Sequence, residues 1–306
     1  EYSQTAWCAE KTIDFIKAEQ GKPWFFSFNC FDPHHPFDPP KEYFEKFNPD
    51  DMPLPSVHTE EADAKTTFQK LDRIWAHNNP GEFQVESMTD QDRRTVYAAY
   101  MAMVSLIDDE VGKILEALEE TGQAGNTLVV FMSDHGEMLG DHGIYFKGPH
   151  FYDCQMRVPL IVRWPNGGLL KNRQVDGFVE LIDLMPTFLE AAGLDIPSAV
   201  QGKSLLSLLK GGDEELYCRK QVYAEYYNAW THKEAYGTML RTKEWKIVVY
   251  HGTNQGEFYD LQKDPEEFFN LWNNPEFQEL KQEYILKCFD ASVLSMDPNP
   301  PRLGPF

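Results

Sequence analysis

A short apolar run from Leu128 to Met132 most constrains the fold of this chain, because it stops abruptly at a polar segment. Its length and continuous apolar character are typical of a buried strand. The next residues, Ser133-Asp134-His135-Gly136, place a carboxylate and an imidazole side by side at the carboxyl end of that strand. Open α/β sheets bind their ligands at this end. The pattern therefore predicts a ligand site directly after the strand.

A second apolar run, Val158 to Trp164, predicts another strand that returns to the same sheet. Lys147 lies between the two runs, flanked by Phe146 and Gly148. Most lysines are solvated surface charges, and that interpretation applies here as well. A lysine between metal-type residues and a buried strand could instead face an anionic ligand.

Helical and apolar segments alternate before this region. Residues 5–19 predict a helix, and the continuously apolar segment Trp24 to Phe31 predicts a central strand of a parallel sheet. Thr89 predicts an N-cap, with Asp92 in a capping box, for a helix that carries apolar residues on one face as far as Leu118. Such alternation is typical of a parallel sheet flanked by helices.

The pattern changes near residue 212, where we place a domain boundary between residues 1–212 and 213–306. Short aromatic or β-branched segments separated by turns then predict a small antiparallel sheet, at Gln221–Tyr227, Gly237–Arg241, Trp245–Tyr250 and Glu257–Leu261. A last helix is predicted over Pro275 to Cys288. The predicted fold class is α/β: a mostly parallel sheet flanked by helices, followed by a small subdomain with an antiparallel sheet and a helix.

Charge and composition exclude several classes of function. The 306 residues carry 49 acidic and 28 basic side chains, a net charge of -21, which argues against binding to nucleic acid or to an anionic membrane through a general field. No apolar run approaches the roughly 18 residues of a membrane span. The five cysteines are widely spaced and predict neither a disulfide framework nor a zinc site. An anionic substrate would therefore need local attraction from a metal ion and a few cationic side chains.

A proline-rich segment, Asp32 to Pro40, follows the first predicted strand. It cannot be helix or strand, because each proline fixes φ and restricts the residue before it. Such a stiff loop can present His34 or His35 at a defined position. Both could be ordinary turn residues, or one could protonate or orient a leaving-group oxygen.

Asp134 and His135 suit a metal site, because a hard divalent cation prefers carboxylate oxygen and an imidazole can add a nitrogen donor. Alternatively, Asp134 only caps a turn by binding nearby backbone amides. We interpret His142, in the similar segment Gly140 to Gly143, as structural. The residues alone predict a metal-plus-cation anion site without naming the anion.

Six motifs in order resemble the sulfatases of the alkaline phosphatase-like superfamily, and the resemblance covers nearly the whole chain. These motifs are Asp32 to Phe37, Ser133 to Glu137, Lys147-Gly148, Arg157 to Val162, Asp183 to Thr187 with Gln201 to Leu205, and Phe258 to Leu261 with Asp264 to Leu271. One such motif would be weak, but six in order are highly specific. The resemblance implies that residues 1–212 are the C-terminal part of the sulfatase catalytic domain.

The resemblance also implies roles for individual residues. Asp134 and His135 would bind a divalent metal, usually calcium, together with two acidic residues near the N-terminus of the family. Lys147 would contact the sulfate oxygens, and His34 would approach the ester oxygen. Metal and lysine would then stabilise charge on the sulfuryl oxygens while His34 helps the alcohol to depart. The motif gives His35 no such role. The implied activity is hydrolysis of a sulfate ester on a small molecule or carbohydrate.

One departure from the family concerns the nucleophile. Sulfatases use a formylglycine made from the cysteine of a C-x-P-S-R segment, and none of the five cysteines here begins that pattern. We expect the nucleophile and the two acidic ligands upstream of Glu1, so that this chain alone is inactive. The missing first strands would leave an exposed sheet edge through which the chain could self-associate. The resemblance suggests an exported or lysosomal location.

Two alternatives stay open. A phosphonate or phosphate ester hydrolase of the same superfamily would use the same metal and cationic groups. A non-catalytic domain could instead have kept the scaffold to bind a sulfated ligand. The aromatic and charged segment from Tyr223 to His232 could line the pocket entrance and suit a sulfated sugar, although aromatic residues in a small sheet more often form core.

Overall fold

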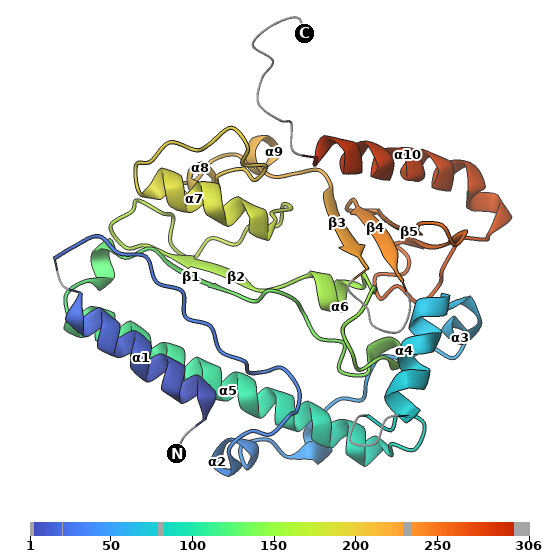
Figure 1. Ribbon diagram of the computed structural model, residues 1–306, viewed down its shortest axis with the longest axis horizontal. Coiled ribbons are helices and arrows are strands. Elements are labelled where there is room, and N and C mark those ends of the chain that lie inside the picture. Colours follow the sequence, from blue (N-terminus) through green and yellow to red (C-terminus); the bar gives the residue numbers. More distant parts are fainter. Residues whose placement is uncertain (1–2, 20, 79–82, 229–233, 297–306) are drawn as a thin grey trace, which may run out of the picture.

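The computed structural model describes residues 3–19, 21–78, 83–228 and 234–296 (Figure 1). Its helices are α1 (Gln4–Ala18), α2 (Lys41–Phe44), α3 (Glu61–Ala64), α4 (Thr67–Asn78), α5 (Asp90–Glu120), α6 (Asp153–Met156), α7 (Leu184–Ala191), α8 (Leu206–Leu209), α9 (Glu214–Tyr217) and α10 (Gln278–Leu294). Its strands are β1 (Val129–Met132), β2 (Leu160–Arg163), β3 (Val222–Tyr227), β4 (Tyr236–Arg241), β5 (Trp245–Tyr250) and β6 (Gln255–Asp260). None of the described helices is long and apolar enough to cross a bilayer.

The long helix α5 begins at the predicted capping box, which is confirmed. The Thr89 side chain accepts the Asp92 N–H at 3.2 Å, and the Asp92 carboxylate accepts the Thr89 N–H at 2.7 Å. Both bonds satisfy backbone donors that the first turn leaves unpaired. Helix α1 packs along α5 (Figure 1), where Ile16 is buried against Leu118 and Val129 of β1 lies against the same cluster. The two helices therefore form a layer beneath β1.

Strands β1 and β2 confirm the two apolar runs as strands, but they pair antiparallel, with Val129 opposite Arg163 and Met132 opposite Leu160. The described strands contain no parallel pair. The strands are antiparallel because their connection, residues 133–159, returns to the end of the sheet that it left: Met132, the last residue of β1, lies opposite Leu160, the first residue of β2. The predicted site residues after β1 all lie on this one connection. In Figure 1 the strand pair lies between α5 and α7.

The segment Trp24 to Phe31 is extended but is not a strand in the described structure, so the prediction of a central strand there is wrong. A strand requires a hydrogen-bonded neighbour, and no described segment forms a ladder with this one. Several of its apolar side chains are consequently exposed, and Phe25 is 75% exposed, although Trp24 packs against the Ile16 cluster. On nearby β2, Ile161 is 62% exposed. Self-association through this apolar surface stays a prediction.

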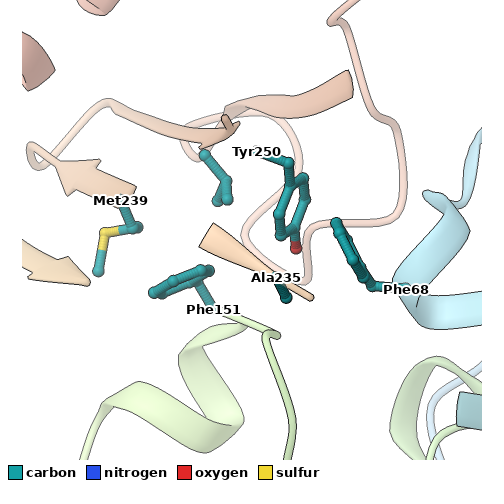
Figure 2. Close-up of a cluster of buried hydrophobic side chains, with 6 residues drawn as sticks. Phe68, Phe151, Ala235, Met239 and Tyr250 are labelled. Atoms are coloured by element: carbon teal, nitrogen blue, oxygen red, sulfur yellow. The ribbon is translucent and has the colours of Figure 1, made fainter. Parts of the chain in front are cut away.

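The C-terminal sheet confirms the predicted antiparallel arrangement, with the strand order β3-β4-β5-β6. Helix α10 extends beyond its predicted end and packs Tyr284 and Cys288 against β4, β5 and β6. A second cluster joins the sheet to other parts of the chain (Figure 2): Phe68 of α4 faces Tyr250 of β5 at a centroid distance of 4.9 Å, and Phe151 packs beside them. The sheet thereby holds the segment that follows Lys147. The predicted boundary at residue 212 stays a prediction.

Helix α6 is attached to this sheet by a buried ionic cluster. The Lys246 ammonium, on β5, lies 2.5 Å from Asp153 Oδ1 and 2.5 Å from Glu267 Oε1, and its side chain is fully buried. Arg241 on β4 adds a second cation, with Nη2 2.9 Å from Asp153 Oδ2. Removing one member of such a cluster leaves buried charges without compensation.

We predict that Lys246→Met lowers the free energy of unfolding by about 3–5 kcal/mol, because the substitution keeps most of the side-chain volume but leaves Asp153 and Glu267 undercompensated. Urea denaturation measures the change. The matched control is Lys220→Met, which breaks an exposed pair with Glu215 and should change the free energy by less than about 1 kcal/mol. Equal effects of the two substitutions would contradict the assigned role of the cluster.

Candidate functional site

The turn after β1 exposes its carboxylate. The Ser133 hydroxyl donates to the His135 carbonyl at 2.7 Å, and the His135 N–H donates to Asp134 Oδ1 at 3.0 Å. These local bonds fix the turn, while the Asp134 side chain remains 82% exposed. The structure therefore places Asp134 and His135 at the carboxyl end of β1, as predicted, with the carboxylate open to a ligand.

The hydrogen bonds of His135 determine which ring nitrogen can accept. Its Nδ1 lies 2.8 Å from the Gly136 carbonyl oxygen. Because a carbonyl can only accept, Nδ1 carries a proton, and in the neutral ring the lone pair is on Nε2. This tautomer is the one that binds a metal ion or accepts a proton through Nε2.

Gly136 permits a close contact between this turn and α6. Its N–H donates to the Gln155 carbonyl at 2.7 Å, and the N–H of Glu137 donates to the Cys154 carbonyl at 3.1 Å. A Cβ at position 136 would lie 2.0 Å from the Cys154 oxygen, so only glycine fits. The contact fixes the turn against the far end of the connection.

Lys147 and His135 line one cavity of about 260 Å³, so the structure brings these two predicted site residues together. The Lys147 side chain is only 16% exposed and forms an ion pair with the buried carboxylate of Glu137. This pair orients the ammonium without a ligand. Glu137 belongs to the motif after β1, but sequence reasoning gave it no role, because nothing in the local pattern shows that it meets a residue ten positions later.

The proline-rich loop brings His34 to the same place. The His34 ring lies 6.4 Å from the His135 ring, measured between centroids, although about one hundred residues separate them in the chain. His34 also stacks on His35 at 4.1 Å, and its Nδ1 lies 2.5 Å from the His35 carbonyl oxygen. The predicted proximity of His34 to the residues after β1 is therefore present.

His35 lies deeper, with its ring against Phe146 at a centroid distance of 5.4 Å. Burial, followed by the positive charges of Lys147 and His34, lowers the pKa of His35 to about 4. The ring is therefore neutral near pH 7 and adds no charge beside the ammonium. His142 is also structural, as interpreted: its Nδ1 lies 2.9 Å from Glu61 Oε2 and its ring stacks on Tyr152.

The donors present fit part of a metal shell. Among the residues that the structure describes, no group of three or more His, Cys, Asp or Glu side chains is placed to hold a metal ion. Asp134 nevertheless offers an exposed carboxylate beside the free Nε2 of His135. Carboxylate oxygen suits a hard divalent cation such as calcium, and the imidazole adds one nitrogen donor. The pair can supply two ligands, and the identity of the metal stays a prediction.

Two family models match most of this chain. Residues 2–194 match the family model described as sulfatase, and residues 140–291 match that of the N-sulphoglucosamine sulphohydrolase C-terminal region. An arylsulfatase of Clostridium perfringens is 31% identical over 92% of this chain and 56% of its own length. A multifunctional alkaline phosphatase superfamily protein of Trinickia caryophylli is 29% identical over 97% of this chain and 61% of its own length.

The fold also resembles that of a solved structure. The phosphonate monoester hydrolase of Silicibacter pomeroyi superposes with a TM-score of 0.86 at 27% identity, over 97% of this chain and 61% of the other. The likeness confirms the predicted alkaline phosphatase-like fold class. The chain spans less than two thirds of the length of each of these relatives.

We predict that Lys147→Met raises the pKa of His35 from about 4 part of the way toward 6.5, because it removes a nearby positive charge while burial persists. Titration of the histidine ring resonances by NMR measures the shift. Lys220→Met, at an exposed position, should leave the pKa of His35 unchanged.

The same pKa sets a pH dependence of stability. The folded-state pKa of His35 lies below the ordinary value of 6.5, so the unfolded chain binds more protons between about pH 6.5 and pH 4. The contribution of neutral His35 to the free energy of unfolding is therefore fully present above pH 6.5 and is lost as the pH falls through about 4. A His35→Asn variant that showed an equally steep loss of stability over this range would contradict the assignment.

Proposed function

We propose that this chain, which belongs to the sulfatase family, forms the sulfate-binding and metal-binding wall of a sulfuric ester hydrolase. The observation that carries the proposal is the meeting of two separate segments: His135 and Lys147, on the connection after β1, line one cavity, and the His34 ring of the proline-rich loop lies beside His135. Together they offer a cation, an imidazole acceptor and a second imidazole around one small volume.

Lys147 would hold the anionic group of the substrate. Its ammonium is nearly buried and is already oriented by Glu137. Electrostatic attraction is stronger where water is largely excluded, and a donor that needs no reorientation stabilises charge as it develops. Lys147 would thus stabilise negative charge on the sulfuryl oxygens in the transition state.

His34 would serve the leaving group. A histidine within reach of the ester oxygen can deliver a proton as the S–O bond breaks, which makes the alcohol a better leaving group. Its ring lies 6.4 Å from that of His135, measured between centroids, so it would act close to the proposed metal ligands. His35, neutral at pH 7, would support the ring of His34 by stacking.

Asp134 and His135 would hold a divalent ion, expected to be calcium, which supplies Lewis acidity toward the sulfuryl oxygens when bound. The nucleophile is expected to be a formylglycine, and because none of the five cysteines begins a C-x-P-S-R segment, these 306 residues by themselves are expected to be inactive. The likeness of residues 140–291 to an N-sulphoglucosamine sulphohydrolase region supports a sulfated carbohydrate as the substrate class.

A second candidate is phosphonate or phosphate ester hydrolysis, favoured by the structural likeness to a phosphonate monoester hydrolase. A tetrahedral phosphoryl anion would suit the same ammonium and metal ligands. A non-catalytic domain that binds a sulfated ligand is the third candidate.

We predict that the complete gene product containing this chain hydrolyses 4-nitrophenyl sulfate with a higher kcat/KM than 4-nitrophenyl phenylphosphonate or 4-nitrophenyl phosphate. Release of 4-nitrophenol at saturating calcium measures all three activities. A preference for the phosphonate or phosphate ester would support the second candidate instead. Turnover of none of the three, with retained binding of a sulfated ligand, would support the non-catalytic candidate.

Lys147→Ala in the same protein should lower kcat for the preferred ester by about 10²- to 10³-fold, the usual effect of removing one donor to a developing anion. The control is Lys220→Ala, whose ammonium is exposed and which does not line the cavity, so kcat should stay within about twofold. Circular dichroism verifies that both variants fold. A loss of less than about fivefold in the Lys147 variant would contradict its assigned role.

A further inference from the structure

The cavity that holds Lys147 continues to a second wall, which contains a buried imidazole. His150 is 1% exposed, and its Nε2 lies 3.2 Å from Oδ2 of Asp72, a buried residue of α4. A carboxylate accepts a hydrogen bond, so Nε2 carries a proton, and in the neutral ring Nδ1 is an acceptor. That Nδ1 is buried and has no hydrogen-bond partner in the described structure.

A second acceptor on this wall is also unpaired. Gln155 of α6 is 8% exposed, and its Oε1 is buried without a hydrogen-bond partner among the described residues. Burying an unpaired polar atom is unfavourable, and such atoms are rare in folded proteins. Two unpaired acceptors, from His150 and Gln155, lining one cavity are most simply explained by a ligand that supplies hydrogen-bond donors.

The spacing between this wall and Lys147 depends on a glycine. A Cβ at Gly148 would lie 3.0 Å from His150 Nε2, so a side chain there would press on the imidazole. Because residue 148 has no side chain, the His150 imidazole packs closely against Gly148, the residue that follows Lys147. At the rim, exposed Glu225 adds a carboxylate, one oxygen of which accepts the Tyr223 hydroxyl at 3.0 Å.

The cavity is consequently polarised. Its Lys147 end is cationic and suits the sulfate group, whereas the wall of His150, Gln155 and Glu225 carries two unpaired acceptors and a carboxylate. A ligand that fits both ends joins an anionic group to a group carrying O–H or N–H donors. The volume of about 260 Å³ lies just below the roughly 300 Å³ at which drug-sized pockets begin, which suits a single sugar ring.

We propose that His150 and Gln155 form the specificity subsite for the alcohol part of the ester, and that they select a monosaccharide sulfate over an aryl sulfate. Asp72 acts as a positioning residue that binds Nε2 of His150 and leaves its Nδ1 without a protein partner. The inference deepens the proposed function and rests on it for the position of the sulfate group at Lys147.

Gln155→Met tests the proposal with little risk to folding, because it removes an acceptor that has no protein partner and keeps the length of the side chain. In the complete gene product, kcat/KM for a hexosamine 6-O-sulfate should fall by about 3- to 10-fold, the effect of one lost hydrogen bond. The value for 4-nitrophenyl sulfate should stay within about twofold. Thermal unfolding should show equal or slightly higher stability.

His150→Gln is the companion variant. The glutamine amide can reach the position of Nε2 and keep the bond to Asp72, but it leaves no acceptor at the position of Nδ1. It should show the same selective loss for the hexosamine ester. A parallel loss for both esters, or no loss in either variant, would overturn the proposal and indicate that only solvent fills this wall.

Calorimetry separates this inference from the proposed function. If the wild-type protein hydrolyses no sulfate ester, the proposed function fails, but binding of the hexosamine 6-O-sulfate and of inorganic sulfate can still be measured. Gln155→Met should weaken binding of the sugar ester by about 3- to 10-fold and leave inorganic sulfate unchanged. Equal changes for the two ligands, or no binding of the sugar ester by the wild type, would overturn the subsite.

Discussion

The hydrogen bond from the Gly136 N–H to the Gln155 carbonyl joins the two halves of the site, and the rest of the arrangement depends on it. It holds the turn that carries Asp134 and His135 against α6, and α6 is fixed in turn to the C-terminal sheet through Asp153 and Lys246. A continuous chain of buried contacts therefore runs from β5 to the exposed carboxylate. Because no side chain fits at position 136, this contact does not tolerate substitution of the glycine.

The site carries a positive charge, at Lys147, whereas the net charge of the whole chain is negative. A net charge of -21 would repel an anion at long range. Near the cavity, however, Lys147 is partly buried, so its field is weakly screened, and Glu137 holds it in place. An incoming anion would share the ammonium with Glu137 and would not have to order a flexible side chain. Local preorganisation can thus replace general attraction.

Sequence reasoning succeeded where the signal is local. The capping box of Thr89 and Asp92, the strands β1 and β2 and the antiparallel C-terminal sheet follow from composition and spacing. The motifs also identified His34, His135 and Lys147, which the structure brings to one place.

The failures concern long-range proximity. The direction of β2 depends on how its connection returns, and the strand expected over Trp24 to Phe31 needs a hydrogen-bonding partner that the described chain does not supply. The role of His150 depends on Asp72, which lies 78 residues earlier on another element. Neither residue belongs to a periodic pattern, so no spacing rule could have paired them.

The buried ionic cluster at Lys246 affects how truncated forms of this protein should be interpreted. Its cation comes from the C-terminal sheet, whereas Asp153 belongs to the helix that supports the site turn. Deleting the sheet would release α6 and displace Asp134, even though no residue of the sheet touches that carboxylate in the described contacts. A shortened protein would then be inactive because the support of the site is lost, and its inactivity would not be evidence that the deleted region carries catalytic groups.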